Sequence, residues 1–174
     1  MRQPYVSKVV VDMCTGGGEQ LGRAGTVLEQ LTGQTPVQSK ARQTIRDFGI
    51  RRKEPIAVRV TLRHGRAAEF LEKALEAKEN VLLIKNWDDD GNFAFGIKEH
   101  IDIPGVKYDP ELGIQGMNIT VCVERPGFRV KRRRKQRSKV PYRHRITPEE
   151  SMVFIRKKFG IEILEKERER TYLF

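Results

Sequence analysis

The chain has 174 residues, of which 38% are hydrophobic and 33% charged, and its formal net charge is +11. This length is that of one domain, and the hydrophobic fraction is sufficient for a core. No stretch is long and apolar enough to span a bilayer, and the first ten residues lack the apolar segment of a secretory signal. We therefore expect a cytoplasmic protein that is neither membrane-spanning nor secreted.

The positive charge is concentrated in two segments. Residues 40–66 hold nine Lys or Arg against two acids, and residues 125–148 hold eleven against none. Without these segments the chain has 14 cations and 21 acids, so the rest of the molecule is acidic. Such polarisation predicts a polyanionic partner. The alternatives are a solvated surface loop for the first segment, and a disordered solubilising loop or localisation signal for the second.

The chain begins with a strand pattern. Residues 6–13 alternate, with Val9 and Val11 on one side and Lys8 and Asp12 on the other, as in a half-buried strand. A helix ending at Gly33 is expected next, because four apolar residues share one face: Leu21, Ala24, Leu28 and Leu31. The glycines at 16–18 suggest nucleotide binding. These glycines do not have the spacing of a dinucleotide-binding or P-loop motif. A flexible connection between the strand and the helix is therefore the better interpretation.

Residues 33–56 are neither long enough nor apolar enough to form a buried unit of their own. Gln34-Thr35-Pro36 predicts a turn, and the cations that follow are spaced rather than paired with acids. Phe48-Gly49-Ile50 then places a glycine between two apolar residues that are expected to be exposed, directly before Arg51, Arg52 and Lys53. We interpret this segment as a loop built to contact an anion.

Residues 56–63 give the clearest strand of the chain. Ile56, Val58, Val60 and Leu62 point one way, whereas Arg59, Thr61 and Arg63 point the other. A helix follows, with its apolar face formed by Ala67, Phe70, Leu71, Ala74 and Leu75. Residues 81–85, VLLIK, are compatible with a strand or a packed loop.

The acidic residues at 88–90 require comparison with a calcium-binding loop. Asp88, Asp90, Asn92 and Glu99 fall at EF-hand positions one, three, five and twelve. The sixth position of an EF-hand loop needs glycine, but here it is occupied by Phe93. Residues 93–99 also alternate like a strand, so a hairpin turn is the better interpretation.

The last third combines a turn-rich connection, a strand, the basic run and a helix. Residues 103–117 contain repeated Pro and Gly, and residues 118–125 alternate with Ile119, Val121 and Val123 on one side. The basic run is too polar and too repulsive to fold alone. Residues 147–150 then predict a capping box, in a helix that ends at Gly160. The basic run is therefore expected to be an insertion within a domain.

Few residues suggest a catalytic, redox or metal-binding site. Cys14 and Cys122 fit no metal or redox spacing and are expected to be reduced, buried thiols. No nucleophile with a base, paired carboxylates or clustered metal ligands is visible, so we expect no enzyme, no cofactor and no metal. The elements together predict an α+β domain over residues 1–174, in which an antiparallel sheet has helices packed on one face and its other face free, with a basic loop at 125–146 and a C-terminal tail at 165–174.

Several separate segments resemble one family. GQTPVQSKAR followed by FGIR, together with VSKVVVDM, IAVRVTLRHG, GNFAFGIKEH, YDPELGIQGMNITV and RPGFRV, is similar to the universal large-subunit ribosomal protein "L five" in its archaeal and eukaryotic branch. The resemblance covers about residues 6–163. It implies the same α+β fold and the role of a protein that anchors 5S rRNA to the large (23S-type) rRNA in the central protuberance. It also implies contact with peptidyl-site tRNA and with neighbouring ribosomal proteins.

The resemblance also implies which residues contact RNA. The positions matched to the 5S rRNA surface are Lys8, Asp12, Gln34, Arg59, Thr61 and Arg63. The loop matched to the tRNA elbow contains Arg46, Phe48, Gly49, Ile50, Arg51, Arg52 and Lys53. The basic run matched to ribosomal RNA or tRNA nearby contains Arg129, Lys131, Arg132, Arg133, Arg134, Lys135, Arg137 and Lys139. Relatives often carry Asn at position 12, where an acid accepts hydrogen bonds but cannot donate them.

Two other classes of protein remain open. An RNA-processing enzyme would need a catalytic constellation and would turn over 5S rRNA. A generic nucleic-acid-binding module would bind any RNA with similar affinity. The RNA that co-purifies with the protein would discriminate between these classes and a structural ribosomal protein.

Overall fold

The computed structural model describes residues 1–165, so the expected C-terminal tail lies, apart from Glu165, outside the described residues. The main sheet has five antiparallel strands in the order β2-β3-β1-β6-β5. Their bounds are β1 Tyr5–Cys14, β2 Val37–Lys40, β3 Pro55–Leu62, β5 Phe93–Ile97 and β6 Met117–Glu124. The predicted α+β fold with an antiparallel sheet is confirmed.

The sheet has one apolar face because its strands alternate in register. Val11 of β1 lies opposite Val60 of β3 and Ile119 of β6, and all three are buried. Helices α1 (Glu19–Thr32) and α2 (Gly65–Glu76) contribute their apolar faces to the same core. Helix α1 ends at Gly33, as predicted, and Gly33 has the left-handed conformation that is common at helix ends. Burial of these side chains is the main favourable term for the fold.

Helix α4 (Pro148–Phe159) follows the basic run and returns the chain to the core through Ile155. Its predicted capping box is present, with Thr147 accepting from the Glu150 backbone N–H and Glu150 accepting from that of Thr147. A parallel pair, β4 (Val81–Leu83) with β7 (Glu162–Leu164), joins two segments that are distant in sequence. The sequence analysis did not anticipate this pair.

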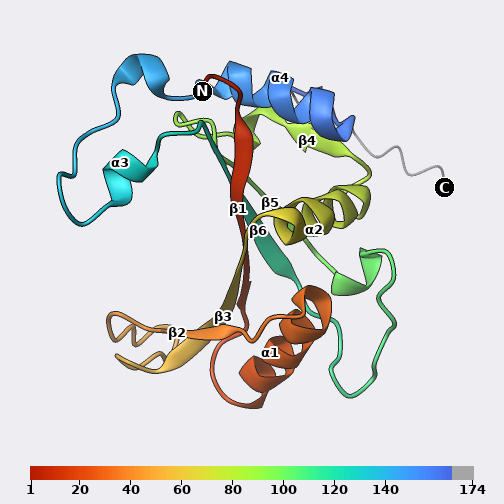
Figure 1. The fold of residues 1–174 in the computed structure, drawn as a ribbon. Coiled ribbons are helices and arrows are strands. Elements are labelled where there is room, and N and C mark those ends of the chain that lie inside the picture. Colours follow the sequence, from red (N-terminus) through yellow and green to blue (C-terminus); the bar gives the residue numbers. More distant parts are fainter. Residues whose placement is uncertain (166–174) are drawn as a thin grey trace.

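The basic run and the loop joining β2 to β3 lie on the side of the sheet away from α1 and α2. In Figure 1, α1 and α2 lie to the right of β1 and β6, whereas α3 (Arg129–Arg132) and the loop joining β2 to β3 extend to the left. Short 3-10 helices complete the fold at Ile84–Asn86, His100–Asp102 and Tyr142–His144. No helix among residues 1–165 is long and apolar enough to cross a membrane.

The interpretation of residues 88–92 as a turn is confirmed. The Asp88 carboxylate accepts hydrogen bonds from the backbone N–H groups of Asp90, at 3.1 Å, and Asn92, at 2.7 Å. Trp87 and Phe93 pair across the turn as an antiparallel bridge. Within residues 1–165, no group of three or more His, Cys, Asp or Glu side chains could hold a metal ion. The carboxylate that resembled a calcium ligand therefore stabilises its own turn.

The expectation that both cysteines are buried is wrong. Cys14 is exposed and Cys122 is half-buried, and both are free thiols. Each follows a core residue in an alternating strand, Met13 in one case and Val121 in the other, so each points to the opposite face. Partial burial raises the pKa of the Cys122 thiol, and the nearby charge of Lys8 acts in the opposite direction.

Candidate nucleic-acid interface

The outward surface of β3, β1 and β6, which we term the sheet face, is built from two rows of paired residues. One row runs Arg59, Asp12, Asn118 and Gly96 across neighbouring strands, and the other runs Thr61, Val10, Thr120 and Ala94. Side chains in these rows are short, apart from Arg59. The result is a flat polar surface whose donors and acceptors are held on regular backbone.

Two of the predicted RNA-contact residues bind each other on this face. Arg59 donates to the Asp12 carboxylate through Nε at 2.8 Å and through Nη2 at 2.7 Å. This bidentate pair raises the pKa of Arg59, first through the hydrogen bonds and then through the negative charge of Asp12. The side chain of Arg59 is 52% exposed and that of Asp12 only 20%. Asp12 therefore fixes the plane of a guanidinium whose remaining N–H groups stay accessible.

The other residues of that set surround the pair. Thr61 is exposed beside Val10, and half-buried Lys8 lies opposite Cys122. Arg63 is exposed one residue beyond the end of β3. Gln34 is not on the sheet face, since it lies in the connection between α1 and the edge strand β2. The structure thus groups five of the six residues and places the sixth in a neighbouring turn.

Asn118 and Thr120 belong to the same surface but were not predicted as site residues. Both are exposed, and they pair with Asp12 and Val10 respectively. The signal was present in the sequence, because Ile119 and Val121 point inward and their neighbours must point outward. What was missing was the knowledge that β6 lies next to β1.

The segment matched to tRNA contact, residues 43–56, runs from the ordered loop that joins β2 to β3, residues 41–54, into the start of β3. Ile45 and Ile50 exchange two backbone hydrogen bonds at 2.9 and 3.1 Å. Ile50 was expected to be exposed but is half-buried. The turn beyond them closes where the Gly49 N–H donates to the Arg46 carbonyl at 3.0 Å, with Gly49 at a φ of 64°. Phe48 stands at this tip and is 76% exposed.

The side chains of Arg51 and Arg52 are exposed, whereas their backbone groups are bound. The Arg51 N–H donates to the Glu54 carboxylate at 2.8 Å, and the Arg52 N–H donates to the Thr44 hydroxyl at 3.0 Å. Lys53 has a φ of 71°, a left-handed conformation that few side chains favour. The loop therefore keeps its shape through main-chain contacts and leaves its cationic side chains available.

The basic run forms a projecting segment, residues 125–146, which we term the basic arm. Its ends are attached to the body, since Val140 and Ile146 are buried and Arg125 pairs with Glu150 at 2.7 Å. Between these anchors, all eight cations of the predicted run are exposed. Among them Arg132 pairs with Glu124 of β6, and the Arg133 Nε donates to the Gln136 carbonyl at 2.8 Å. The arm was expected to be unable to fold alone, and in the structure it is attached to the body at both ends.

Comparisons with known proteins agree with this architecture. Residues 1–51 match the model of the family described as ribosomal protein L5, and residues 55–154 match the model that describes the C-terminus of the same family. A large ribosomal subunit protein uL5 from Aeropyrum pernix is 52% identical over 163 residues, covering 92% of this chain and 85% of that protein. Proteins of the same name are 48% identical in Pyrobaculum aerophilum, covering 94% and 92%, and in Methanococcus vannielii, covering 94% and 93%.

Proposed function

The chain belongs to the ribosomal protein L5 family, and from that premise we propose that it is a structural constituent of the large ribosomal subunit in the cytoplasm. We further propose that it binds 5S rRNA through the sheet face and anchors it to the large rRNA in the central protuberance. The observation that carries this proposal is the pair of outward rows on β3, β1 and β6. No helix of residues 1–165 covers these rows, and short polar groups there are suited to reading bases splayed from an RNA loop.

Within this surface, the residues have different roles. Thr61, Asn118 and Thr120 present hydroxyl and amide groups that can donate and accept hydrogen bonds to base edges. Arg59, Lys8 and Arg63 supply charge for phosphates. Asp12 acts as a positioning residue, because its carboxylate is occupied by Arg59 and holds that guanidinium in place. This role accounts for an acid on a surface that faces a polyanion.

The loop at 41–54 is proposed to contact the elbow of peptidyl-site tRNA, and the basic arm is proposed to contact large-subunit RNA or tRNA nearby. Support comes from the exposed Phe48 tip, which can lie on a base surface, and from the exposed cations behind it. The two loops leave the sheet at different places, which allows separate RNA segments to be bound at once (Figure 1).

The proposal is tested by RNA selectivity. Wild-type protein is expected to bind 5S rRNA more tightly than an unrelated folded RNA of equal length at moderate salt, and to co-purify with 5S rRNA from its own cells. Equal affinity for both RNAs would favour a generic module, and cleavage or modification of 5S rRNA by the pure protein would favour an enzyme. Either result would contradict the proposal.

A further inference from the structure

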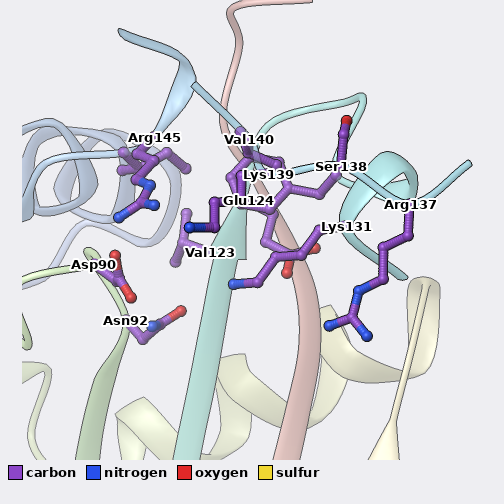
Figure 2. A pocket seen from close by; sticks show the side chains of 12 residues that line it. Asp90, Asn92, Val123, Glu124, Lys131, Arg137, Ser138, Lys139, Val140 and Arg145 are labelled. Carbon is purple, nitrogen blue, oxygen red and sulfur yellow. The ribbon is translucent and has the colours of Figure 1, made fainter. Parts of the chain in front are cut away.

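A pocket lies where the basic arm leaves the body, beyond the Glu124 end of the sheet face. Its walls come from the turn at 88–92, the end of β6 and the arm itself. Figure 2 shows Lys131 and Lys139 of the arm extending toward Asp90 and Asn92 of the turn. Gly91 permits this arrangement, because a Cβ at its position would lie 2.9 Å from Ile146 Cγ2 and 3.1 Å from the Thr147 carbonyl.

The lining combines three kinds of chemistry. Four cations outnumber two acids, which favours an anionic ligand. Four apolar side chains form a further part of the wall: Val123, Phe128, Val140 and Ile146. The Phe128 ring lies next to the His144 ring, with the two ring centroids 5.9 Å apart. A ligand that matches this lining has a negative group at one end and a flat, weakly polar group at the other.

Glu124 adds a specific requirement. Its side chain is only 12% exposed, and one carboxylate oxygen, Oε1, accepts from Arg132. The other oxygen, Oε2, is buried and accepts no hydrogen bond from any residue in the described part of the chain. Buried polar atoms in folded proteins nearly always have a partner. An N–H donor on a bound molecule would satisfy Oε2.

We propose that this pocket binds a single unstacked nucleotide of large-subunit RNA. The phosphate lies against Lys131 and Lys139, and the base lies against the apolar wall at Phe128. The exocyclic amino group of the base donates to Glu124 Oε2, which selects cytosine, adenine or guanine over uracil. RNA loops supply bases that are free to enter such a site. The inference rests on the proposed ribosomal function and adds a base-reading residue to the basic arm.

The test uses the full chain and two fluorescently labelled probes, decacytidylate and decauridylate, at moderate salt. The two pyrimidine strands carry the same charge and differ in the group that Glu124 would read. Wild-type protein is expected to prefer decacytidylate by about tenfold. Glu124→Gln is expected to reduce this ratio to about one, because the amide removes the charged acceptor and can donate to uracil instead.

Two variants separate base reading from anchoring of the arm. Arg132→Gln breaks the ion pair with Glu124 but keeps its carboxylate, so the preference for decacytidylate should persist. Glu99→Gln makes the same chemical change at an exposed site outside the pocket and should leave the ratio unchanged. Three results would overturn the inference: equal binding of both probes by wild-type protein, a preference that survives Glu124→Gln, or its loss in Arg132→Gln.

The affinity for 5S rRNA is measured with the same preparations. If wild-type protein discriminates 5S rRNA from unrelated RNA but does not discriminate between the two decanucleotides, only the proposal of a nucleotide-binding pocket is wrong. If it fails to discriminate 5S rRNA, the proposed function is wrong independently of the pocket.

Discussion

The sheet face and the basic arm both lie away from α1 and α2, but they hold their charged groups in opposite ways. On the sheet face, Arg59 is bound to Asp12 on regular strand backbone. On the basic arm, seven of the eight cations in the predicted run have no acidic partner among the described residues, and only Arg132 is paired. This contrast indicates that fixed polar groups are suited to selecting an RNA, whereas free cations on an irregular segment are suited to neutralising phosphates of any sequence.

The largest effect is expected from the arm. Replacing all five cations of residues 131–135 with Ser should lower the affinity for large-subunit RNA and flatten its salt dependence. Each lost phosphate contact reduces the slope of log K against log salt by about 0.7 to 0.9. Because Arg132 is already paired with Glu124, four contacts are expected, and the slope should fall by about three. Filter binding over a salt series measures it.

Thermal unfolding of that variant provides the control. The four unpaired cations contribute little to the core, whereas loss of Arg132 leaves the largely buried Glu124 carboxylate without its partner, so the melting temperature should fall modestly while the protein stays folded. An unchanged salt slope would show that the arm contacts only solvent.

The sheet face should show the reverse signature, a loss of affinity without a change in salt slope. Thr61→Ala and Asn118→Ala are each expected to weaken 5S rRNA binding by about 1 to 3 kcal/mol, the range for losing a base-reading contact. Gln34→Ala should do the same if the turn beside α1 contacts the RNA. Thr26→Ala is the matched control, because Thr26 is exposed on α1 and donates to the Gly22 carbonyl. Equal losses for Thr61 and Thr26 would remove the sheet face from the interface.

A smaller and separate effect is expected for the loop at 41–54. The double variant Arg51→Ala, Arg52→Ala removes two exposed side chains but keeps the backbone hydrogen bonds to Glu54 and Thr44. Ribosomes assembled with it should keep their 5S rRNA and release peptidyl-site tRNA several-fold faster. Lys40→Ala with Arg42→Ala removes the same charge at the base of the loop and serves as the control. Wild-type tRNA release, or parallel loss of 5S rRNA, would contradict this division of labour.

The smallest effect concerns Asp12, where charge and positioning predict opposite signs. Removing an acid near a polyanion should strengthen binding if charge alone matters. Releasing Arg59 from its bidentate pair should weaken binding if its fixed plane matters. We expect Asp12→Ala to weaken 5S rRNA binding by about 1 kcal/mol, with a coupling of similar size in a cycle with Arg59→Ala. Tighter binding by Asp12→Ala would exclude the positioning role.

Local patterns predicted most of the fold, and long-range pairing explains what they missed. The alternation around Val9, Val58 and Ile119 correctly identified the core sides of three strands, since period two is a local property. The short strands β2 and β7 have no clear alternation and exist because they pair with β3 and β4. The pair between Asp12 and Arg59 depends on the register of strands 47 residues apart, which no local pattern contains.

The candidate site was predicted only in part, and here too the missed features depend on long-range contacts. Charge distribution located the basic arm but not its attachment, because Val140 and Ile146 become anchors only when the arm folds back on the body. The two cysteines were expected in the core on the basis of their apolar neighbours. The alternation of those neighbours places them on the sheet face instead.

These two thiols provide the most direct test of where 5S rRNA binds. Cys14 lies at the end of β1 beside Asp12 and Asn118, and Cys122 lies opposite Lys8. Alkylation proceeds through the thiolate, so the raised pKa of the half-buried Cys122 should slow its reaction in the free protein, and the exposed Cys14 should react first. Iodoacetamide labelling followed by mass spectrometry gives both rates in one experiment.

Saturating 5S rRNA should slow alkylation of Cys14 and Cys122 several-fold, whereas an unrelated RNA of equal length, bound through the basic arm, should leave both rates unchanged. If 5S rRNA binds tightly and both cysteines still react at the rates of the free protein, the sheet face is not its binding surface.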